Sequence, residues 1–262
     1  MKLFYRQFGE GRPVIILHGL FGLSDNWVSI GKRIAAKFTV YIPDMRNHGQ
    51  SPHSPTMNYT AMTDDLLEFI EEHSLEEGIL IGHSMGGKVA MNFALDHPKL
   101  LDQLVIIDIS PRRYPARNIH FDIINAMLSV DLQQVTSRSQ VEALLQNVLP
   151  DIRIRQLILK NLFYQAPNTL AWRPNLEAIH NNLELLFDGI ATERTFKKPA
   201  LFVSGGLSDY IKVDDEILIL KMFPLAQIKT IPSATHWVNA DAPKELCRLL
   251  SEFLGKECAF VQ

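Results

Sequence analysis

The sequence predicts an α/β fold, with a mostly parallel central sheet flanked by helices and a helical cap inserted into it. Short, almost entirely apolar segments alternate with segments in which apolar residues recur at helical spacing. Strands that are apolar on both faces are typical of parallel sheets covered by helices on both sides. The alternation stops near Arg112 and resumes near Lys197. We therefore expect an α/β core formed by residues 1–111 and 197–262, and a helical cap formed by residues 112–196.

The composition is that of an ordinary globular protein. The 262 residues are 47% hydrophobic and 21% charged, which is enough apolar material for a sizeable core. A formal net charge of −3 gives no electrostatic basis for binding nucleic acid or an anionic membrane surface. We find no apolar run of membrane-spanning length and no signal peptide, so we expect a cytoplasmic protein. The two cysteines are too few for a disulfide framework or a zinc site.

The first half of the chain follows the strand–helix alternation closely. Its expected strands are fully apolar or rich in β-branched residues and are bounded by glycine, proline or polar loops. We expect strands at residues 1–8, 13–17, 38–42, 78–81 and 104–107, and helices through residues 27–34, 59–73 and 88–95.

The second half begins with a stretch in which we expect helices and no strand. The expected helices cover residues 119–128, 139–149, 152–164 and 175–187. The alternation then resumes with strands at residues 200–204 and 228–231 and helices at residues 214–222 and 243–254. The helical stretch therefore interrupts an α/β frame between two of its consecutive strands.

A serine on a sharp turn lies at the centre of this pattern. Ser84 occupies the middle of a Gly-x-Ser-x-Gly motif, with an expected strand before it and an expected helix after it. This arrangement is typical of a nucleophile elbow, in which the turn forces the serine into a strained backbone conformation. Gly82 and Gly86 carry no Cβ, so the strand and the helix can approach each other closely. The start of the helix then directs N–H groups toward negative charge that develops beside the Ser84 hydroxyl.

The chain also supplies a candidate base and two candidate acids for this serine. A serine hydroxyl is a weak nucleophile that needs a general base, and the base needs a carboxylate to orient it. His236 lies between the last expected strand and the last expected helix, as the base does in the chain order Ser, acid, His. Asp108 follows the strand at residues 104–107, and Asp209 follows the strand at residues 200–204. Both are expected at the same edge of the sheet, and the residue pattern alone does not choose between them.

Backbone and side-chain groups near these motifs are expected to support the serine. The N–H groups of Leu20 and Met85 are candidates for an oxyanion hole. His18 is expected to organise the loop that contains Leu20, and His83 is expected to have no direct role in the chemistry.

The sequence predicts no metal site. His48 and His53 lie in a polar loop with Asp44, but no third or fourth ligand has metal-binding spacing, so we expect structural hydrogen bonds there. The glycines around Ser84 lack the Lys-Ser/Thr ending of a phosphate-binding loop.

Several of these motifs together resemble a known family. The resemblance to the α/β-hydrolase superfamily covers nearly the full chain and rests on His18-Gly19, the glycine-rich motif at residues 82–87 and His236. The strings at residues 44–51, 82–88 and 105–111 are similar to those of the YbfF-type acyl-CoA esterases of bacteria and their mitochondrial alpha/beta-hydrolase-domain relatives. In that family the acid lies at the position of Asp108. The resemblance therefore implies an α/β-hydrolase fold with Ser84, Asp108 and His236 as the catalytic triad.

The motifs and the resemblance predict a serine hydrolase that cleaves carboxylic esters or acyl-CoA thioesters through an acyl-enzyme intermediate, without a cofactor. We expect the cap to cover the site and to supply an acyl pocket from apolar residues such as Leu162 and Trp172. The candidate substrate-binding residues are Phe21, Trp237 and Arg112. Arg112 belongs to a basic cluster with Arg113 and Arg117 that is a candidate for pairing with coenzyme A phosphates.

Two other functions are compatible with the same residues. One is hydrolysis or cleavage of a C–C bond by the same triad, and the other is non-catalytic ligand binding by a receptor on the hydrolase scaffold. A serine rather than an aspartate at the elbow argues against dehalogenase and epoxide hydrolase chemistry. The expected partner is a small-molecule ester or acyl-CoA, not nucleic acid or a membrane, and the sequence predicts no oligomeric state.

Overall fold

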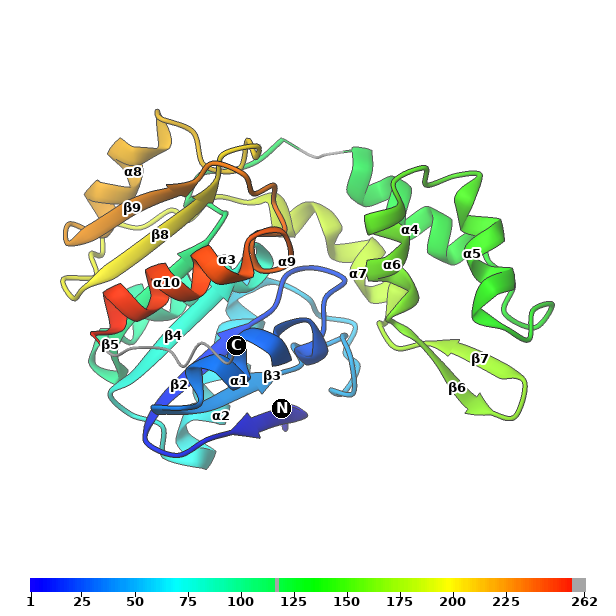
Figure 1. Ribbon diagram of the computed structural model, residues 1–262, viewed down its shortest axis with the longest axis horizontal. Helices are drawn as coiled ribbons and strands as arrows, with labels where there is room; N and C mark the ends of the chain where they lie inside the picture. The colour runs from blue at the N-terminus through cyan, green and yellow to red at the C-terminus, as the bar shows by residue number, and fades with distance from the viewer. Residues whose placement is uncertain (116–117, 256–262) are drawn as a thin grey trace.

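The structure is built on one sheet that joins both halves of the chain. The computed structural model describes residues 1–115 and 118–255, and its main sheet has seven strands in the order β1-β3-β2-β4-β5-β8-β9 (Figure 1). The strands are β1 (Tyr5–Phe8), β2 (Arg12–Leu17), β3 (Phe38–Pro43), β4 (Gly78–His83), β5 (Leu101–Ile107), β8 (Ala200–Gly205) and β9 (Ala226–Ile231). β1 pairs with β3 antiparallel, and the other neighbouring strands are parallel. The predicted α/β architecture is confirmed.

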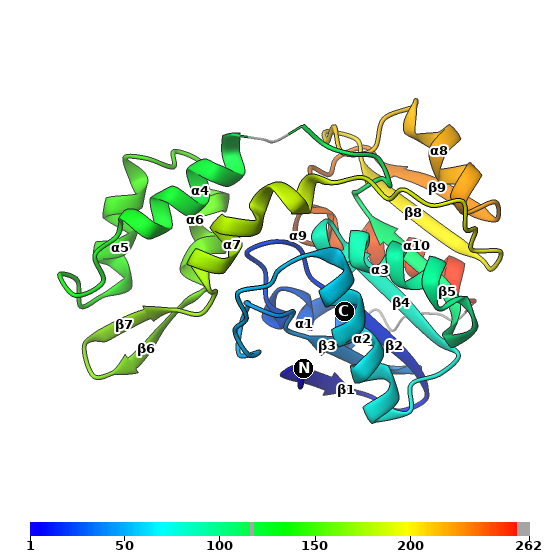
Figure 2. The same ribbon diagram turned by 180° about the vertical axis from the view of Figure 1, so that it is seen from behind.

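Helices cover both faces of this sheet, which explains why its strands are apolar on both sides. On one face, α1 (Val28–Ile34) and α10 (Pro243–Leu254) bury their apolar residues against the strands. On the other face, a second hydrophobic cluster contains residues of α2 (Tyr59–His73), α3 (Met85–Asp96) and α8 (Asp215–Met222). The first layer is in front in Figure 1 and the second is in front in Figure 2. Shorter helices are η1 (Ser24–Trp27), η2 (Pro98–Leu100) and α9 (Val238–Asp241).

The chain between β5 and β8 forms an inserted segment on one side of the core, at the right of Figure 1. It contains α4 (Asn118–Ser129), α5 (Arg138–Gln146), α6 (Ile152–Leu159), the strands β6 (Leu162–Ala166) and β7 (Thr169–Trp172), α7 (Leu176–Asn182) and the 3-10 helix η3 (Leu183–Phe187). Polar residues begin its helices: the side chains of Ser137, Asp151 and Asn175 accept hydrogen bonds from N–H groups in the first turns of α5, α6 and α7. Of the described helices, none combines the length and the apolar character that crossing a membrane requires.

A β-hairpin in the inserted segment corrects the prediction that this stretch holds no strand. β6 and β7 pair antiparallel, with Leu162 opposite Trp172. The helix expected to run to residue 164 ends at Leu159 instead. The turn between the strands contains Asn168 in the left-handed region, with φ of 61°, a conformation that asparagine tolerates better than most residues. Aromatic residues favour a strand on either side of such a turn, and this preference outweighs the helical spacing.

One buried lysine ties both ends of the inserted segment to the core. Lys88, in the first turn of α3, is 1% exposed. Its ammonium group donates hydrogen bonds to the carbonyls of Pro111 (3.0 Å), Arg112 (2.7 Å) and Asp188 (2.9 Å). Burial lowers the pKa of Lys88 from 10.5 to about 7. The chain therefore leaves the core and returns to it at the same point.

The junction between β4 and α3 requires close contact between backbones. A Cβ added at Gly86 would lie 2.6 Å from the carbonyl oxygens of Leu17 and His18, at the end of β2. A Cβ added at Gly82 would lie 2.3 Å from the Gly86 carbonyl oxygen. Because these contacts are with backbone atoms, no side-chain rotation relieves them. The glycines of the motif therefore allow α3 to begin directly beside the ends of β2 and β4.

We predict that Gly86→Ala lowers the free energy of unfolding by about 3 kcal/mol, because the new methyl group must push α3 away from β2. Urea unfolding measures this change. The control is Gly31→Ala in α1, where the added Cβ meets mainly the flexible end of Ile42 at 2.8 Å. There the gain in helix propensity is about 1 kcal/mol, so the net change should be small. Equal losses in the two variants would contradict the packing argument.

Candidate active site

Three polar side chains meet beyond the carboxyl ends of the parallel strands. Ser84 lies between β4 and α3, Asp108 directly follows β5, and His236 lies between β9 and α9. The Ser84 Oγ lies 3.0 Å from His236 Nε2, and His236 Nδ1 lies 2.7 Å from Asp108 Oδ2. The structure thus brings together the serine, the histidine and one of the two aspartates that the sequence suggested.

The hydrogen bonds of His236 define which of its nitrogens carries the proton. An ionised carboxylate can only accept, so Nδ1–H donates to Asp108. Nε2 is then unprotonated and accepts a hydrogen bond from the Ser84 hydroxyl. This tautomer is the one that can take a proton from the serine.

The Asp108 carboxylate is fully buried and surrounded by donors. Its Oδ1 accepts a hydrogen bond from the Gly205 N–H at 2.9 Å, and its Oδ2 accepts a second from the Ser208 hydroxyl. Asp108 itself has φ of 50°, in the left-handed region, which turns its side chain back toward the end of β8. Three donors on one carboxylate stabilise its negative charge away from water.

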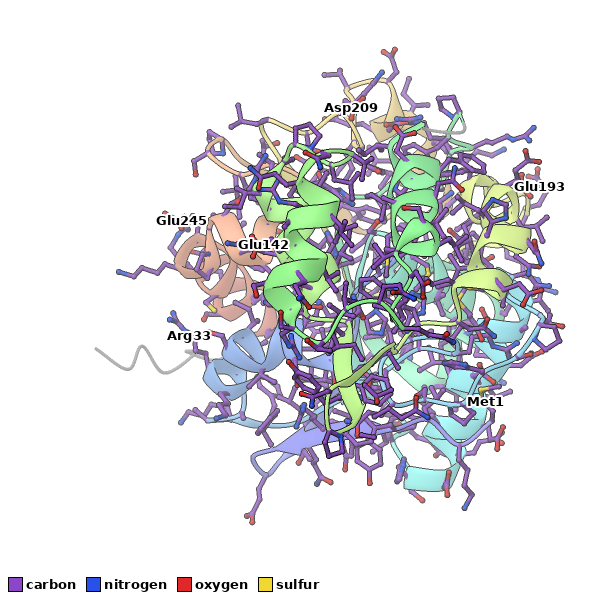
Figure 3. All side chains as sticks on the ribbon, turned by 90° about the vertical axis from the view of Figure 1, so that its right-hand side faces the viewer. Met1, Arg33, Glu142, Glu193, Asp209 and Glu245 are labelled. Carbon is purple, nitrogen blue, oxygen red and sulfur yellow. The ribbon has the colours of Figure 1, made fainter. Side chains whose placement is uncertain are left out.

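Asp209, the other candidate acid, lies at the periphery. It is exposed, and Figure 3 shows it at the outer edge of the molecule. Its backbone carbonyl accepts a hydrogen bond from Arg112 at 3.2 Å. The preceding residue, Ser208, donates a hydrogen bond to Asp108.

Two further contacts hold His236, one to its ring and one to its backbone. Tyr210 stacks on it, with ring centroids 3.8 Å apart and an angle of 17° between the planes. The His83 Nε2–H donates to the His236 carbonyl at 2.8 Å. Burial, together with the nearby His236, lowers the pKa of His83 from 6.5 to about 3, so this ring is neutral. His83 thus supports the loop that carries His236.

Leu20 and Met85, whose N–H groups are the candidate oxyanion donors, both lie beside Ser84. Both residues line a cavity that also contains Ser84. Met85 is the first residue of α3, so its N–H has no acceptor within the helix. Leu20 lies in a turn in which the Gly22 N–H donates to the Gly19 carbonyl at 2.9 Å. A Cβ at Gly19 would lie 3.1 Å from the Ser84 Cβ, so this turn passes directly over the serine.

Two buried, neutral histidines hold that turn. The His18 Nδ1–H donates to the Gly19 carbonyl at 2.8 Å, and its Nε2 accepts from the Met45 N–H at 3.0 Å. The His48 Nδ1–H donates to the Arg46 carbonyl, and its Nε2 accepts from the Phe21 N–H at 3.2 Å. Burial lowers the pKa of His18 to about 4 and that of His48 to about 3. Each ring therefore donates at one nitrogen and accepts at the other.

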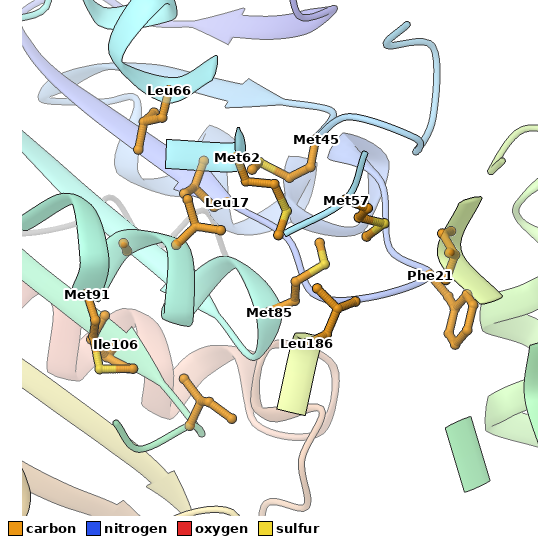
Figure 4. Packing of buried hydrophobic residues seen from close by; sticks show 14 of the residues in the cluster. Leu17, Phe21, Met45, Met57, Met62, Leu66, Met85, Met91, Ile106 and Leu186 are labelled. Carbon is orange, nitrogen blue, oxygen red and sulfur yellow. The ribbon is translucent and has the colours of Figure 1, made fainter. Parts of the chain in front are cut away.

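The cavity at Ser84 is small, and a larger one lies next to it. The first has a volume of about 30 Å³ and is lined by Ile109, Leu186, Phe187 and Tyr210, among others. The second has a volume of about 470 Å³ and includes Trp237. Leu20 lines both. Figure 4 shows Leu186 beside Met85 at the start of α3.

Other candidate substrate-binding residues lie elsewhere. The Phe21 side chain is 1% exposed and lines neither cavity, and in Figure 4 its ring lies apart from Met85. Arg112 pairs with Asp215 at 2.9 Å, and its guanidinium group lies over the Tyr114 ring.

The rest of the expected basic cluster and acyl pocket is also placed differently. Arg113 pairs with Asp188 at 3.4 Å, and Arg117 lies outside the described residues. Leu162 and Trp172 face each other in the β6–β7 hairpin and do not line the cavity at Ser84.

The polar loop that carries two histidines is held by hydrogen bonds. His48 makes the bonds given above, and the His53 Nε2–H donates to the Arg173 carbonyl at 2.8 Å. Within residues 1–115 and 118–255, no group of three His, Cys, Asp or Glu side chains is placed to hold a metal.

Several supporting residues were missed from the sequence. Ser208 and Tyr210 flank Asp209 in the loop that follows β8. A polar and an aromatic residue in a loop after a strand were the signal that could have identified them. Lys88 carried a signal as well, because a cation is unfavourable at the start of a helix and its neighbours are apolar. Asn161, which donates to the Phe21 carbonyl at 2.7 Å, had no recognisable signal.

Comparisons with known proteins agree on one family. A family model described as alpha/beta hydrolase fold matches residues 12–243. The sn-1-specific diacylglycerol lipase ABHD11 of Danio rerio is 40% identical over 252 residues, which cover 94% of this chain and 79% of that protein. Esterase YbfF of Escherichia coli is 33% identical over 243 residues and covers 93% of each chain. A solved structure called marine microorganism esterase is 41% identical, has a TM-score of 0.94 and covers 96% of this chain and 99% of its own.

We predict that acid destabilises the protein through its buried histidines. In the unfolded chain His18, His48 and His83 bind protons near pH 6.5, whereas their folded pKa values are about 4, 3 and 3. Their contribution to stability is complete above pH 6.5 and is lost as the pH falls toward 3, by about 1.4 kcal/mol per pH unit for each histidine. Urea unfolding at pH 7, 6, 5 and 4 measures the slope. His48→Gln should reduce it, and an unchanged slope in that variant would contradict the assignment.

Proposed function

This chain belongs to the alpha/beta hydrolase fold family, and on that premise we propose that it is a carboxylic ester hydrolase with a serine mechanism. The relatives described above are named as a lipase or as esterases, which supports this class of reaction. The observation that carries the proposal is the unbroken line of hydrogen bonds from Ser84 through His236 to Asp108. We assign these residues the roles of nucleophile, general base and orienting acid.

The reaction follows from the protonation state of His236. As the Ser84 Oγ attacks the ester carbonyl carbon, its proton passes to His236 Nε2. The resulting imidazolium is stabilised by the buried Asp108 carboxylate, which does not itself take the proton. The carbonyl oxygen becomes an oxyanion that accepts hydrogen bonds from the N–H groups of Leu20 and Met85.

The intermediate then collapses to an acyl-enzyme. The bond between the carbonyl carbon and the leaving oxygen breaks, and His236 gives its proton to that oxygen. Water attacks the acyl-enzyme by the same route, with His236 again as base, and releases the carboxylic acid and the free Ser84 hydroxyl. Apart from the substrate and this water, the groups used are side chains and backbone N–H groups of the chain.

The two cavities suggest what kind of ester fits. The cavity at Ser84, of about 30 Å³, is much smaller than its neighbour of about 470 Å³. We propose that the small cavity receives a short acyl group and that the larger one receives the leaving group beside Trp237. Acyl-CoA thioesters are included as candidate substrates, because attack on a thioester carbonyl needs the same groups. We also propose that residues 112–196 act as a cap, since Leu186 and Phe187 of this segment line the cavity at Ser84.

We predict that Ser84→Ala lowers kcat for p-nitrophenyl acetate about 10⁶-fold, because the nucleophile is removed. Asp108→Asn should lower kcat about 10⁴-fold through loss of the correct histidine tautomer. Asp209→Asn is the matched control, with an expected change of less than about twofold, since exposed substitutions away from the site have little effect. A large loss in Asp209→Asn with activity kept in Asp108→Asn would reverse the assignment.

The substrate class is tested with p-nitrophenyl esters of increasing chain length and with acyl-CoA thioesters. Acetate and butyrate esters should have higher kcat/KM than the palmitate ester, since the small cavity excludes long chains. The ratio of ester to thioester hydrolysis then identifies the preferred leaving group. Absence of activity on both classes by folded protein would favour C–C bond hydrolysis or ligand binding instead.

A further inference from the structure

The Leu20 N–H lies at the end of a chain of hydrogen bonds that begins in the inserted segment. The Asn161 Nδ2–H donates to the Phe21 carbonyl at 2.7 Å. The peptide group that contains this carbonyl also contains the Gly22 N–H, which donates to the Gly19 carbonyl at 2.9 Å. The Gly19 carbonyl in turn belongs to the peptide group that contains the Leu20 N–H. Two peptide groups therefore connect the Asn161 amide to the candidate oxyanion donor.

This chain of bonds affects both the direction and the strength of the last donor. A peptide group is planar and trans, so fixing its carbonyl fixes the opposite direction of its N–H. A hydrogen bond accepted by the carbonyl also polarises the N–H of the same group, and such effects add along a chain of bonds. The Gly19 carbonyl also accepts the His18 Nδ1–H at 2.8 Å, so the Leu20 N–H is constrained and polarised both by this direct bond and by the chain of bonds that begins at Asn161.

Phe21 makes the loop dependent on outside support. It is the third residue of the turn at residues 19–22 and has φ of 59°, where glycine or asparagine is usual. For a phenylalanine this conformation is strained, and it persists only when the surroundings hold it. His48 holds its N–H from the core, and Asn161 holds its carbonyl from the inserted segment.

Asn161 is held firmly in the position from which it donates to the Phe21 carbonyl. It follows α6, is fully buried, and its backbone N–H and carbonyl are bonded to Ile158 (2.8 Å) and Arg173 (2.9 Å). Its Nδ2 faces two carbonyl oxygens, those of Phe21 and Leu157, so the amide group is the donor there. Its Oδ1 is buried and has no hydrogen-bond partner among the described residues. An unpaired buried acceptor lowers the stability of the fold, which argues against a purely stabilising role for this side chain.

We propose that Asn161 is a positioning residue that fixes the Leu20 N–H for oxyanion stabilisation, so that the inserted segment completes the catalytic site as well as covering it. This inference rests on the proposed serine mechanism. Asn161 touches no reacting atom and acts through the turn at residues 19–22.

A second asparagine provides a matched control. Asn182 also lies in the inserted segment, and its Nδ2 donates to the carbonyl four residues earlier, that of Ala178, at 2.8 Å. It donates as well to a core carbonyl, that of Pro55, at 2.9 Å. Asn161 likewise donates to the carbonyl four residues earlier and to one core carbonyl. The core partner of Asn161 lies in the turn at residues 19–22, whereas Pro55 does not. The two asparagines therefore make the same kinds of bond to different core loops, with Asn161 fully buried and Asn182 half-buried.

The experiment compares Asn161→Leu, Asn161→Ala and Asn182→Ala with the unaltered protein. Active sites are titrated with a fluorophosphonate, and kcat and KM are measured per titrated site for an ester and for the corresponding thionoester. Sulfur is a larger and weaker acceptor than oxygen, so the ratio of ester to thionoester rates reports on the oxyanion hole. Complete loss of one oxyanion donor costs about 10²–10³ in kcat, and for the Asn161 variants we expect about a tenfold loss. In the Asn161 variants the ratio of ester to thionoester rates should fall together with kcat, while KM changes little. Asn182→Ala should keep both kcat and this ratio unchanged.

Unchanged kcat and ester preference in the titrated Asn161 variants would overturn the proposal, and so would equal losses in Asn182→Ala. Loss of all titratable sites in both Asn161 variants, with normal titration of Asn182→Ala, would assign Asn161 to folding and also overturn it. Ser84→Ala is run alongside. Full activity in that variant would refute the serine mechanism itself, which separates failure of the proposed function from failure of this inference.

Discussion

The burial of the Asp108 carboxylate is the constraint on which the rest of the site depends. A charge with no exposure to water must have donors around it, and here they come from two separated parts of the chain: Gly205 and Ser208 at the end of β8 and just after it, and His236 after β9. Satisfying one carboxylate therefore fixes the loop after β8 and the loop after β9 at the end of β5. The position of His236 relative to Ser84 follows. The Tyr210 ring restricts the imidazole further, and the His83 N–H holds the His236 backbone carbonyl.

The other half of the site is built from neutral groups. His18 and His48 are buried where a positive charge would be costly, so each acts as a fixed donor and acceptor that orients the turn over Ser84. In the proposed mechanism, the Asp108 charge stabilises the imidazolium and the dipoles of this turn stabilise the oxyanion. Because both are held in place before a substrate arrives, little reorganisation is needed during the reaction.

The sequence predicted the frame of the molecule because its signals are local. The Gly-x-Ser-x-Gly motif and the apolar strands indicate the elbow and the sheet from neighbouring residues alone. The two aspartates could not be separated in that way, since β5 and β8 are adjacent parallel strands and both residues follow them. The pairing of Arg112 with Asp215 and the bond from Asn161 to Phe21 join residues far apart in the sequence, so no local pattern indicates them. The β6–β7 hairpin was missed in part because the first residues of β6 also fit the helical spacing of the segment before it.

The Lys88 ammonium group also determines how the two ends of the inserted segment are joined to the core. Its three hydrogen bonds hold the outgoing and returning backbone side by side, so for the core the whole segment is equivalent to a long surface loop. The entropy of closing a loop grows slowly, by about 0.6 kcal/mol for each doubling of length, so the sheet is nearly indifferent to how many residues lie between β5 and β8. A segment of another size or shape can therefore replace this one without disturbing the strands, provided that its ends present carbonyls to Lys88. If Asn161 has the role proposed above, a replacement segment also needs its own donor for the Phe21 carbonyl to keep full activity.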